Sequence, residues 1–113
     1  TYDFSKLDKI MKLVKENGLK VCMATSTAAH PAWMARKYPD VLRVEHNGMK
    51  RKFGARHNSC PNSPNYRKYS AALVEKIAER YKDYDNIVAW HINNEFGGWC
   101  YCENCEKGTV FRQ

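Results

Sequence analysis

The sequence predicts an α/β fold with parallel strands, and three observations support this. Amphipathic helical patterns alternate with short apolar segments, each apolar segment follows its helix after a brief turn, and the second apolar segment ends in polar residues. The order helix, strand, long loop, helix, strand is typical of α/β proteins. Two such strands are only part of a barrel or of a doubly wound sheet. In both architectures, sites form beyond the C-terminal ends of the strands.

The first helix is expected to begin near Ser5 and to stop at Asn17-Gly18. Residues 5–8 resemble a capping box with Asp in place of the usual Glu, and glycine readily adopts the left-handed conformation that ends helices. Apolar residues at helical spacing form one face: Leu7, Ile10, Met11 and Val14. The segment 19–25 that follows is short and largely apolar, which is typical of a buried parallel strand.

The second helix is expected to begin at Asn62-Ser63-Pro64, where a polar N-cap precedes a proline. Its buried face consists of residues at spacings of three and four: Tyr66, Tyr69, Leu73, Ile77 and Tyr81. Residues 87–92 form the second predicted strand. This strand ends in Asn93-Asn94-Glu95, which places polar side chains where an α/β fold forms its sites.

A long connection joins the two units. Pro31 begins a short helix that Pro39 stops. Asn47-Gly48, flanked by residues 41–44 and 52–53, indicates a hairpin. Connections of this length are uncommon unless they are functional, so we expect part of the site to lie here.

Composition excludes some classes of function. The formal charge is +7, which indicates either a polyanion-binding surface or acidic residues elsewhere in a longer protein. The basic residues are scattered without a nucleic-acid motif, so no nucleic-acid partner is expected. The chain has neither an apolar run long enough to span a bilayer nor a signal peptide, so we expect a cytoplasmic protein without membrane contact. It begins without Met and ends without a closing element, so we expect part of a longer protein.

Glu95 is the candidate catalytic residue. A carboxyl group just beyond a buried strand is suited to general acid chemistry, because partial burial raises its pKa and keeps it protonated near neutral pH. The adjacent Asn94 offers an amide to a substrate hydroxyl. A structural Glu at the end of a strand is the alternative, since a short Asn-Glu pattern is a weak signal.

The five cysteines favour a metal site over disulfides, because their number is odd and no secretory signal accompanies them. Cys100, Cys102 and Cys105 form a C-x-C-x-x-C pattern that brings three thiolates together. Cys60 is the natural fourth ligand. Four thiolates without an open position indicate structural zinc. Cys22 lies within a predicted strand and is expected to pack as a small apolar residue.

Several segments together resemble glycoside hydrolase family 42, the β-galactosidases. They are residues 24–33, Lys37-Tyr38-Pro39, Cys60-Pro61-Asn62-Ser63-Pro64 and the run from Trp90 to Glu95. The likeness covers nearly the whole chain, in order. It implies that residues 1–113 are part of a (β/α)8 catalytic domain, about its third and fourth strands with their flanking helices.

The resemblance also implies functional roles. Glu95 corresponds to the acid/base of a retaining β-galactosidase, while Asn94 and Arg56 correspond to residues that bind the galactosyl unit. The nucleophile, a second Glu, lies outside this chain. A subset of the family has a four-cysteine zinc site that Cys60, Cys100, Cys102 and Cys105 match, and full-length members are commonly homotrimers. The zinc would hold the loop of Arg56 and Cys60 against the loop after Glu95.

Two features depart from the family pattern. His30 stands where the family often has Pro, which places an ionisable group near the mouth of the site. The segment between Glu95 and Cys100 is short, which leaves the shape of that loop open. Trp33, Phe96 and Trp99 flank the proposed site and are candidates for contact with sugar rings, whereas packing is the favoured role for Trp90 and Phe96.

A second hypothesis belongs to a different class. The chain would then be a small structural zinc-binding module whose cysteine loop mediates contacts with macromolecules. The two buried-strand patterns disfavour this hypothesis, because a zinc ribbon needs little core. Under the first hypothesis the substrate is a β-galactoside, and this chain alone is not expected to turn it over.

Overall fold

The computed structural model describes residues 2–54, 56–95 and 97–106, and its element order confirms the predicted alternation of helices and strands. The first unit contains α1 (Ser5–Glu16) and β1 (Val21–Ala24). The connection contains α2 (Ala32–Lys37) and the 3₁₀ turn η1 (Pro39–Val41). The second unit contains α3 (Pro64–Tyr81) and β2 (Ile87–His91), and α4 (Glu103–Glu106) follows.

The strands β1 and β2 pair in parallel, as predicted, and bring Met23 opposite Trp90 and Ala24 opposite His91. The pairing continues past β1, because the Thr25 N–H donates to the His91 carbonyl at 3.0 Å. Both strands are shorter than predicted, since Leu19 and Ile92 lie outside them. Parallel pairing places the two C-terminal ends at the same edge, where the long connection and the polar run after β2 also lie.

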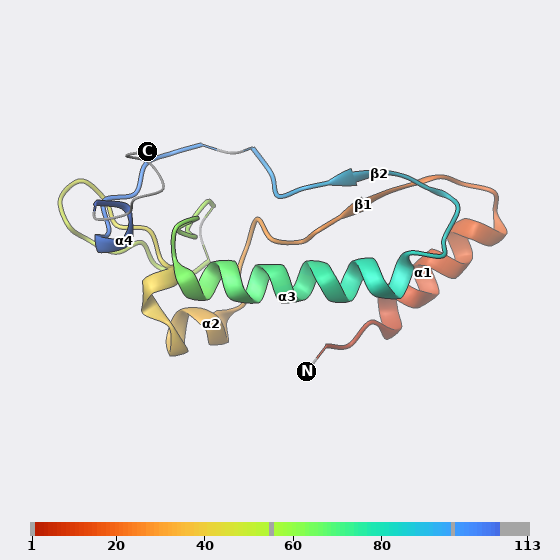
Figure 1. Ribbon diagram of the computed structural model, residues 1–113, viewed down its shortest axis with the longest axis horizontal. Coiled ribbons are helices and arrows are strands. Elements are labelled where there is room, and N and C mark those ends of the chain that lie inside the picture. The colour runs from red at the N-terminus through yellow and green to blue at the C-terminus, as the bar shows by residue number, and fades with distance from the viewer. Residues whose placement is uncertain (1, 55, 96, 107–113) are drawn as a thin grey trace.

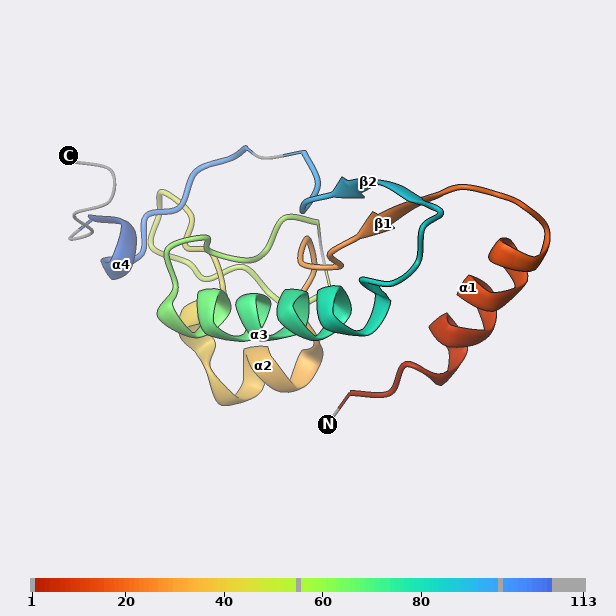
Figure 2. The same ribbon diagram turned by 45° about the vertical axis from the view of Figure 1, so that its right-hand side comes forward.

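Two apolar clusters hold the helices in place. Met11 of α1, Met23 of β1 and both Ile77 and Tyr81 of α3 form the first cluster, between the strands and the helices. The second joins α2, η1 and the start of α3, with Met34, Val41 and Tyr66 at its centre. The predicted apolar face of α3 is thereby confirmed. Figures 1 and 2 show the strands along one side of α3, with α1 beside the end where they begin.

The opposite face of the sheet is open, which corrects the expectation that both strands are buried. Val88 is 61% exposed and Trp90 is 40% exposed. Trp90 therefore does not have the packing role expected for it within the described residues. The physical reason is that α1 and α3 cover one face, and no helix or strand of the described part of the chain covers the other (Figures 1 and 2).

The two helix starts differ from each other. Ser63 caps α3 as predicted, because its hydroxyl accepts from the Tyr66 N–H at 3.2 Å. The capping box predicted for α1 is wrong. Ser5 lies inside the helix, and both its N–H and its hydroxyl donate to Asp3. Asp8 instead accepts hydrogen bonds from Arg80 and Tyr81 of α3.

The connection contains the predicted turn at Asn47-Gly48, where Gly48 has a left-handed φ of 84°. The antiparallel partner of Val44 is Lys50, not the predicted residues 52–53, so the hairpin is tighter than expected. A second bridge joins Leu42 to Ser59, and it returns the chain toward α3. Within the described residues, no helix has both the length and the apolar character needed to cross a membrane.

Asp8 provides a test of how α1 is held against α3. Its carboxylate accepts hydrogen bonds from Arg80 and Tyr81, which lower the pKa of Asp8 from its ordinary 3.8 to about 2. A lowered carboxyl pKa stabilises the fold above the unfolded-state pKa, and this contribution is lost as pH falls through the folded-state pKa. Asp8→Asn should therefore lower the urea midpoint at pH 7, and the difference from wild type should shrink between pH values of about 4 and 2.

The matched control is Asp85→Asn. Asp85 pairs with Lys15 at 3.7 Å and its side chain is 86% exposed, so its loss should change the midpoint little. An equal and pH-independent loss in the two variants would contradict the role given to Asp8.

Candidate active site and cysteine cluster

The turn after β2 is fixed to the end of β1 by hydrogen bonds. The Asn93 N–H donates to Thr25 Oγ1 at 3.1 Å, and Asn93 Nδ2 donates to the Tyr66 hydroxyl at 3.2 Å. That hydroxyl donates in turn to the Thr27 carbonyl at 2.5 Å. Tyr66 therefore links α3 to the loops that follow both strands.

Asn93 and Glu95 both adopt left-handed backbone conformations, with φ values of 62° and 42°. Asn tolerates this region, and here its Oδ1 accepts from the Asn94 N–H at 2.7 Å. Within the described residues Glu95 has no comparable local hydrogen bond, so its conformation costs about 1–3 kcal/mol that the surroundings must offset. Backbone strain of this kind concentrates at functional sites, which adds an independent reason to place one at Glu95.

The structure brings Glu95 and Arg56 together in an ion pair between a Glu95 carboxylate oxygen and Arg56 Nη2. Arg56 Nε also donates to His57 Nε2 at 2.9 Å. The Glu95 side chain is 67% exposed, so the described residues do not supply the burial that the sequence argument expected. The reason is the open face of the sheet beside it.

A cleft of about 730 Å³ opens beside these residues, between the strand ends and the connection. Asn94 lies on its wall, as do Trp99 and Cys100 of the following segment. His57, Ser59 and Tyr66 also line the cleft. Of the aromatic residues expected near the site, Trp99 is thus on the cleft, Trp33 packs edge-on against Tyr69, and Phe96 lies outside the described residues. A cleft of this volume is in the size range of small-molecule binding sites.

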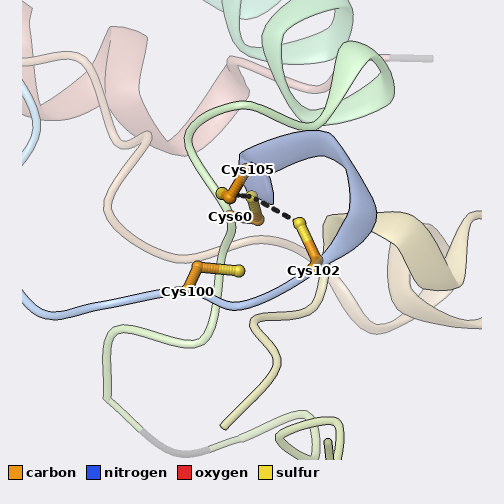
Figure 3. Close-up of side chains that lie close together, drawn as sticks. All are labelled: Cys60, Cys100, Cys102 and Cys105. Carbon is orange, nitrogen blue, oxygen red and sulfur yellow. Dashed lines mark hydrogen bonds between the residues drawn. The ribbon is translucent and has the colours of Figure 1, made fainter. Parts of the chain in front are cut away.

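The four predicted cysteines form one cluster, in which all the sulfur atoms lie within 4.8 Å of one another. Cys60 Sγ is 3.5 Å from Cys102 Sγ and 3.4 Å from Cys105 Sγ. Figure 3 shows Cys60 on the segment that leads to α3, facing Cys100, Cys102 and Cys105 from the segment that ends in α4. Residues 40 or more positions apart are therefore joined at one point.

Polar groups around the cluster favour thiolate ligands. The Val44 N–H donates to Cys100 Sγ and the Asn62 amide donates to Cys105 Sγ, each at 3.4 Å. Burial opposes ionisation of Cys100, but hydrogen bonds from Val44 and Cys102 outweigh it and lower the pKa of that thiol. Burial raises the pKa of Cys60 and of Cys105. A thiol that coordinates a metal cation loses its proton, so a bound cation would overcome the effect of burial on these pKa values. Cys22 lies apart from the cluster in β1 and is exposed, not packed as expected.

Two buried polar residues have roles that the sequence did not reveal. Arg43 is 8% exposed and bonds to backbone carbonyls on both sides of the cleft. His30, which the sequence placed near the mouth of the site, is instead buried, with Nδ1 at 2.5 Å from Ser59 Oγ. Burial lowers the pKa of His30. Neither contact leaves a signal in sequence spacing, because both depend on the path of the connection.

A model of the family described as Beta-galactosidase, glycoside hydrolase family 42, matches residues 1–113. The chain belongs to this family. It is 63% identical over 106 residues to the β-galactosidase BgaA of Planococcus sp. (strain 'SOS Orange'). The matched region covers 94% of this chain and 16% of that protein. It is 53% identical over 106 residues to the β-galactosidase LacZ of Lactobacillus acidophilus, with the same coverages.

Solved structures of family 42 agree with this fold. The β-galactosidase from Bacillus circulans sp. alkalophilus has a TM-score of 0.91 and 64% identity, and covers 95% of this chain and 16% of that one. Gan42B, a β-galactosidase of the same family, has a TM-score of 0.89 and 40% identity, and covers 93% of this chain and 15% of that one. The chain thus spans about a sixth of these relatives. The predicted α/β class, as part of a (β/α)8 barrel, is confirmed.

The hydroxyl of Tyr66 provides a test of how the turn before Glu95 is held. Tyr66→Phe removes the partner of the Thr27 carbonyl and of the Asn93 amide. Leaving these groups unpaired should lower the free energy of unfolding by about 1–3 kcal/mol, measured by urea denaturation.

The control is Tyr69→Phe. Tyr69 lies on the same helix and its hydroxyl is 3.0 Å from that of Tyr38, in a partly exposed pair. Its loss should cost less than that of Tyr66, and a larger effect at Tyr69 would argue against the linking role of Tyr66.

Proposed function

We propose that this chain is part of the catalytic domain of a retaining β-galactosidase that hydrolyses terminal, non-reducing β-D-galactosides. The main observation that supports this proposal is the position of Glu95. It follows β2 in a strained turn beside Asn94 and forms an ion pair with Arg56. The contact of Glu95 with Arg56, and the position of Asn94 next to Glu95 in the chain, support the assignment of these three residues to one sugar site. The names of the relatives in the family support the substrate class.

The proposed reaction divides between Glu95 and a nucleophile outside this chain. In the first step Glu95 gives its proton to the glycosidic oxygen, while the nucleophilic carboxylate forms a bond to the anomeric carbon and the aglycone leaves as an alcohol. In the second step Glu95, now ionised, takes a proton from water. As the proton restores the acid form of Glu95, the water oxygen forms a bond to the anomeric carbon, the bond to the nucleophile breaks, and galactose leaves with net retention.

Arg56 and Asn94 are proposed to hold the galactosyl unit. Asn94 lies on the wall of the cleft and offers both donor and acceptor groups to a sugar hydroxyl. Arg56 is paired with Glu95 in this structure, so a bound galactosyl group has to replace or share that contact. The pair is about two-thirds exposed on both sides, so exchanging it costs little.

The cysteine cluster is proposed to hold structural zinc through Cys60, Cys100, Cys102 and Cys105. Tetrahedral zinc with bonds of about 2.3 Å places its sulfur ligands about 3.8 Å apart. The measured separations of 3.4 and 3.5 Å, and the limit of 4.8 Å over all pairs, fit this geometry. A four-thiolate site has no open position, so the metal would stabilise the loops and take no part in the reaction.

Other properties of the whole protein, expected from the sequence or implied by the family resemblance, are part of the proposal. They are a homotrimeric assembly, a cytoplasmic location, and a nucleophilic Glu supplied from outside residues 1–113. The cleft beside the cysteine cluster supports an enzyme over a zinc module that contacts macromolecules, because it joins the cluster to Asn94 in one concave site.

Glu95→Gln in the complete polypeptide tests the acid/base assignment. The amide keeps the size of the side chain but cannot transfer the proton, so kcat for an alkyl galactoside should fall by about 10²–10⁴-fold. A nitrophenyl galactoside needs little protonation of its leaving group, so its glycosylation step should suffer less. Steady-state kinetics on the two substrates measure the difference.

Glu45→Gln is the matched control, because Glu45 is another carboxylate paired with an arginine, at 2.5 Å from Arg51. It should leave the ratio of the two kcat values unchanged. An unchanged kcat for the alkyl galactoside in the Glu95 variant would remove Glu95 from the mechanism.

Replacing Cys102 by Ser tests the zinc site. The wild-type protein should contain one zinc per chain by elemental analysis. The Cys102→Ser variant should lose most of it and unfold at a lower temperature, because metal binding contributes directly to folding. Cys22→Ser is the control, since this thiol is exposed and outside the cluster. Absence of zinc from the wild type, or full retention in the Cys102 variant, would refute the site.

A further inference from the structure

Arg43 joins the two loops that border the cleft. Its Nε donates to the Ser59 carbonyl at 2.7 Å, and its Nη1 donates to the Gly97 carbonyl at 2.8 Å. Ser59 precedes Cys60, and Gly97 follows Glu95 by two positions. A single guanidinium therefore bridges the connection and the loop after β2.

This bridge is a buried structural contact and not a surface one, because Arg43 is only 8% exposed where it lines the cleft. A hydrogen bond from a charged donor to a carbonyl is stronger than one from a neutral donor, and its loss leaves the acceptor unpaired. The guanidinium is planar and rigid, so two bonds in different directions fix both the distance and the angle between the loops.

The Arg43 side chain occupies the space where a side chain at position 98 would begin. A Cβ placed on Gly98 would lie 2.3 Å from Arg43 Nη1, closer than any real contact. Arg43 cannot move aside freely, because both of its bonds depend on its position. Gly98 also has a φ of 79°, so two separate constraints favour glycine there.

We propose that Arg43 is a positioning residue for Glu95. It joins the Gly97 carbonyl, two positions after Glu95, to the Ser59 carbonyl. On the other side of Glu95 the turn is held at Asn93 by Thr25 and Tyr66. The backbone is thereby held at Asn93 and at Gly97, two positions on either side of Glu95. This inference rests on the proposed acid/base role of Glu95.

Arg43→Met in the complete polypeptide tests the proposal by kinetics. Met fills the inner part of the site but removes both donors. A displaced acid should lower kcat for an alkyl galactoside by about tenfold to a hundredfold, whereas the nitrophenyl galactoside should change by less than about threefold. Arg43→Lys keeps the positive charge and can keep one of the two hydrogen bonds, so its decrease in kcat for the alkyl galactoside should be intermediate. Equal losses on both substrates, as partial unfolding would give, overturn the proposal.

A double-mutant cycle tests the contact without reference to activity. Gly98→Ala should lower the unfolding temperature more than Gly48→Ala. The latter is a matched control, because Gly48 has a similar φ of 84° and an open space where Cβ would lie. Met leaves the Nη1 position empty, so in the Arg43→Met background the excess cost of Gly98→Ala should vanish. An excess that persists there would show that the Arg43–Gly98 fit is wrong.

The two proposals fail in different ways. If Glu95→Gln leaves the alkyl galactoside kcat unchanged, the acid/base role fails and with it the positioning of that acid, while the Arg43–Gly98 coupling still shows in the unfolding temperatures. If Glu95→Gln behaves as expected and Arg43→Met does not discriminate between the substrates, only the positioning role is overturned.

Discussion

The parallel pairing of β1 with β2 determines where every candidate functional group lies. Because both strands run in one direction, their C-terminal ends share an edge, and Thr25 extends the pairing past β1 to His91. The polar turn at Asn93 then reaches the loop of Thr25 directly. An antiparallel pair would place these two loops at opposite ends of the sheet. The apolar cluster centred on Met11, Met23, Ile77 and Tyr81 supports this pairing from one face only.

That single supported face explains what the sequence could and could not predict. Periodicity identified both helices, both strands and the buried face of α3, because local spacing decides them. The sequence also predicted that both strands are buried, yet Val88 and Trp90 are exposed in the described part of the chain. Their pattern is one that a parallel sheet with both faces covered requires. The apolar pattern of a strand reflects everything that packs on it in the complete fold. This chain corresponds to about a sixth of a family 42 relative, so it supplies only part of that packing.

The candidate site shows the same division. Residue type and spacing were sufficient for the four cysteines, because a C-x-C-x-x-C loop needs one further thiol and Cys60 was available. The pairing of Arg56 with Glu95, the burial of His30 and the bridge made by Arg43 were not predictable. Each joins segments that are distant in sequence through an irregular connection, whose path follows from tertiary contacts and not from any repeat.

The segment between Glu95 and Cys100 is held by two contacts with the connection. At its start, Gly97 is bonded to Arg43, and at its end Cys100 enters the cysteine cluster and accepts from Val44. Both anchors lie on the same stretch of the connection, one residue apart. A segment held at two such close points has little freedom, so a longer loop would need a different support for the strained turn at Glu95. The two ends of residues 97–100 are thus held to one stretch of the connection, by buried Arg43 at Gly97 and by Val44 at Cys100.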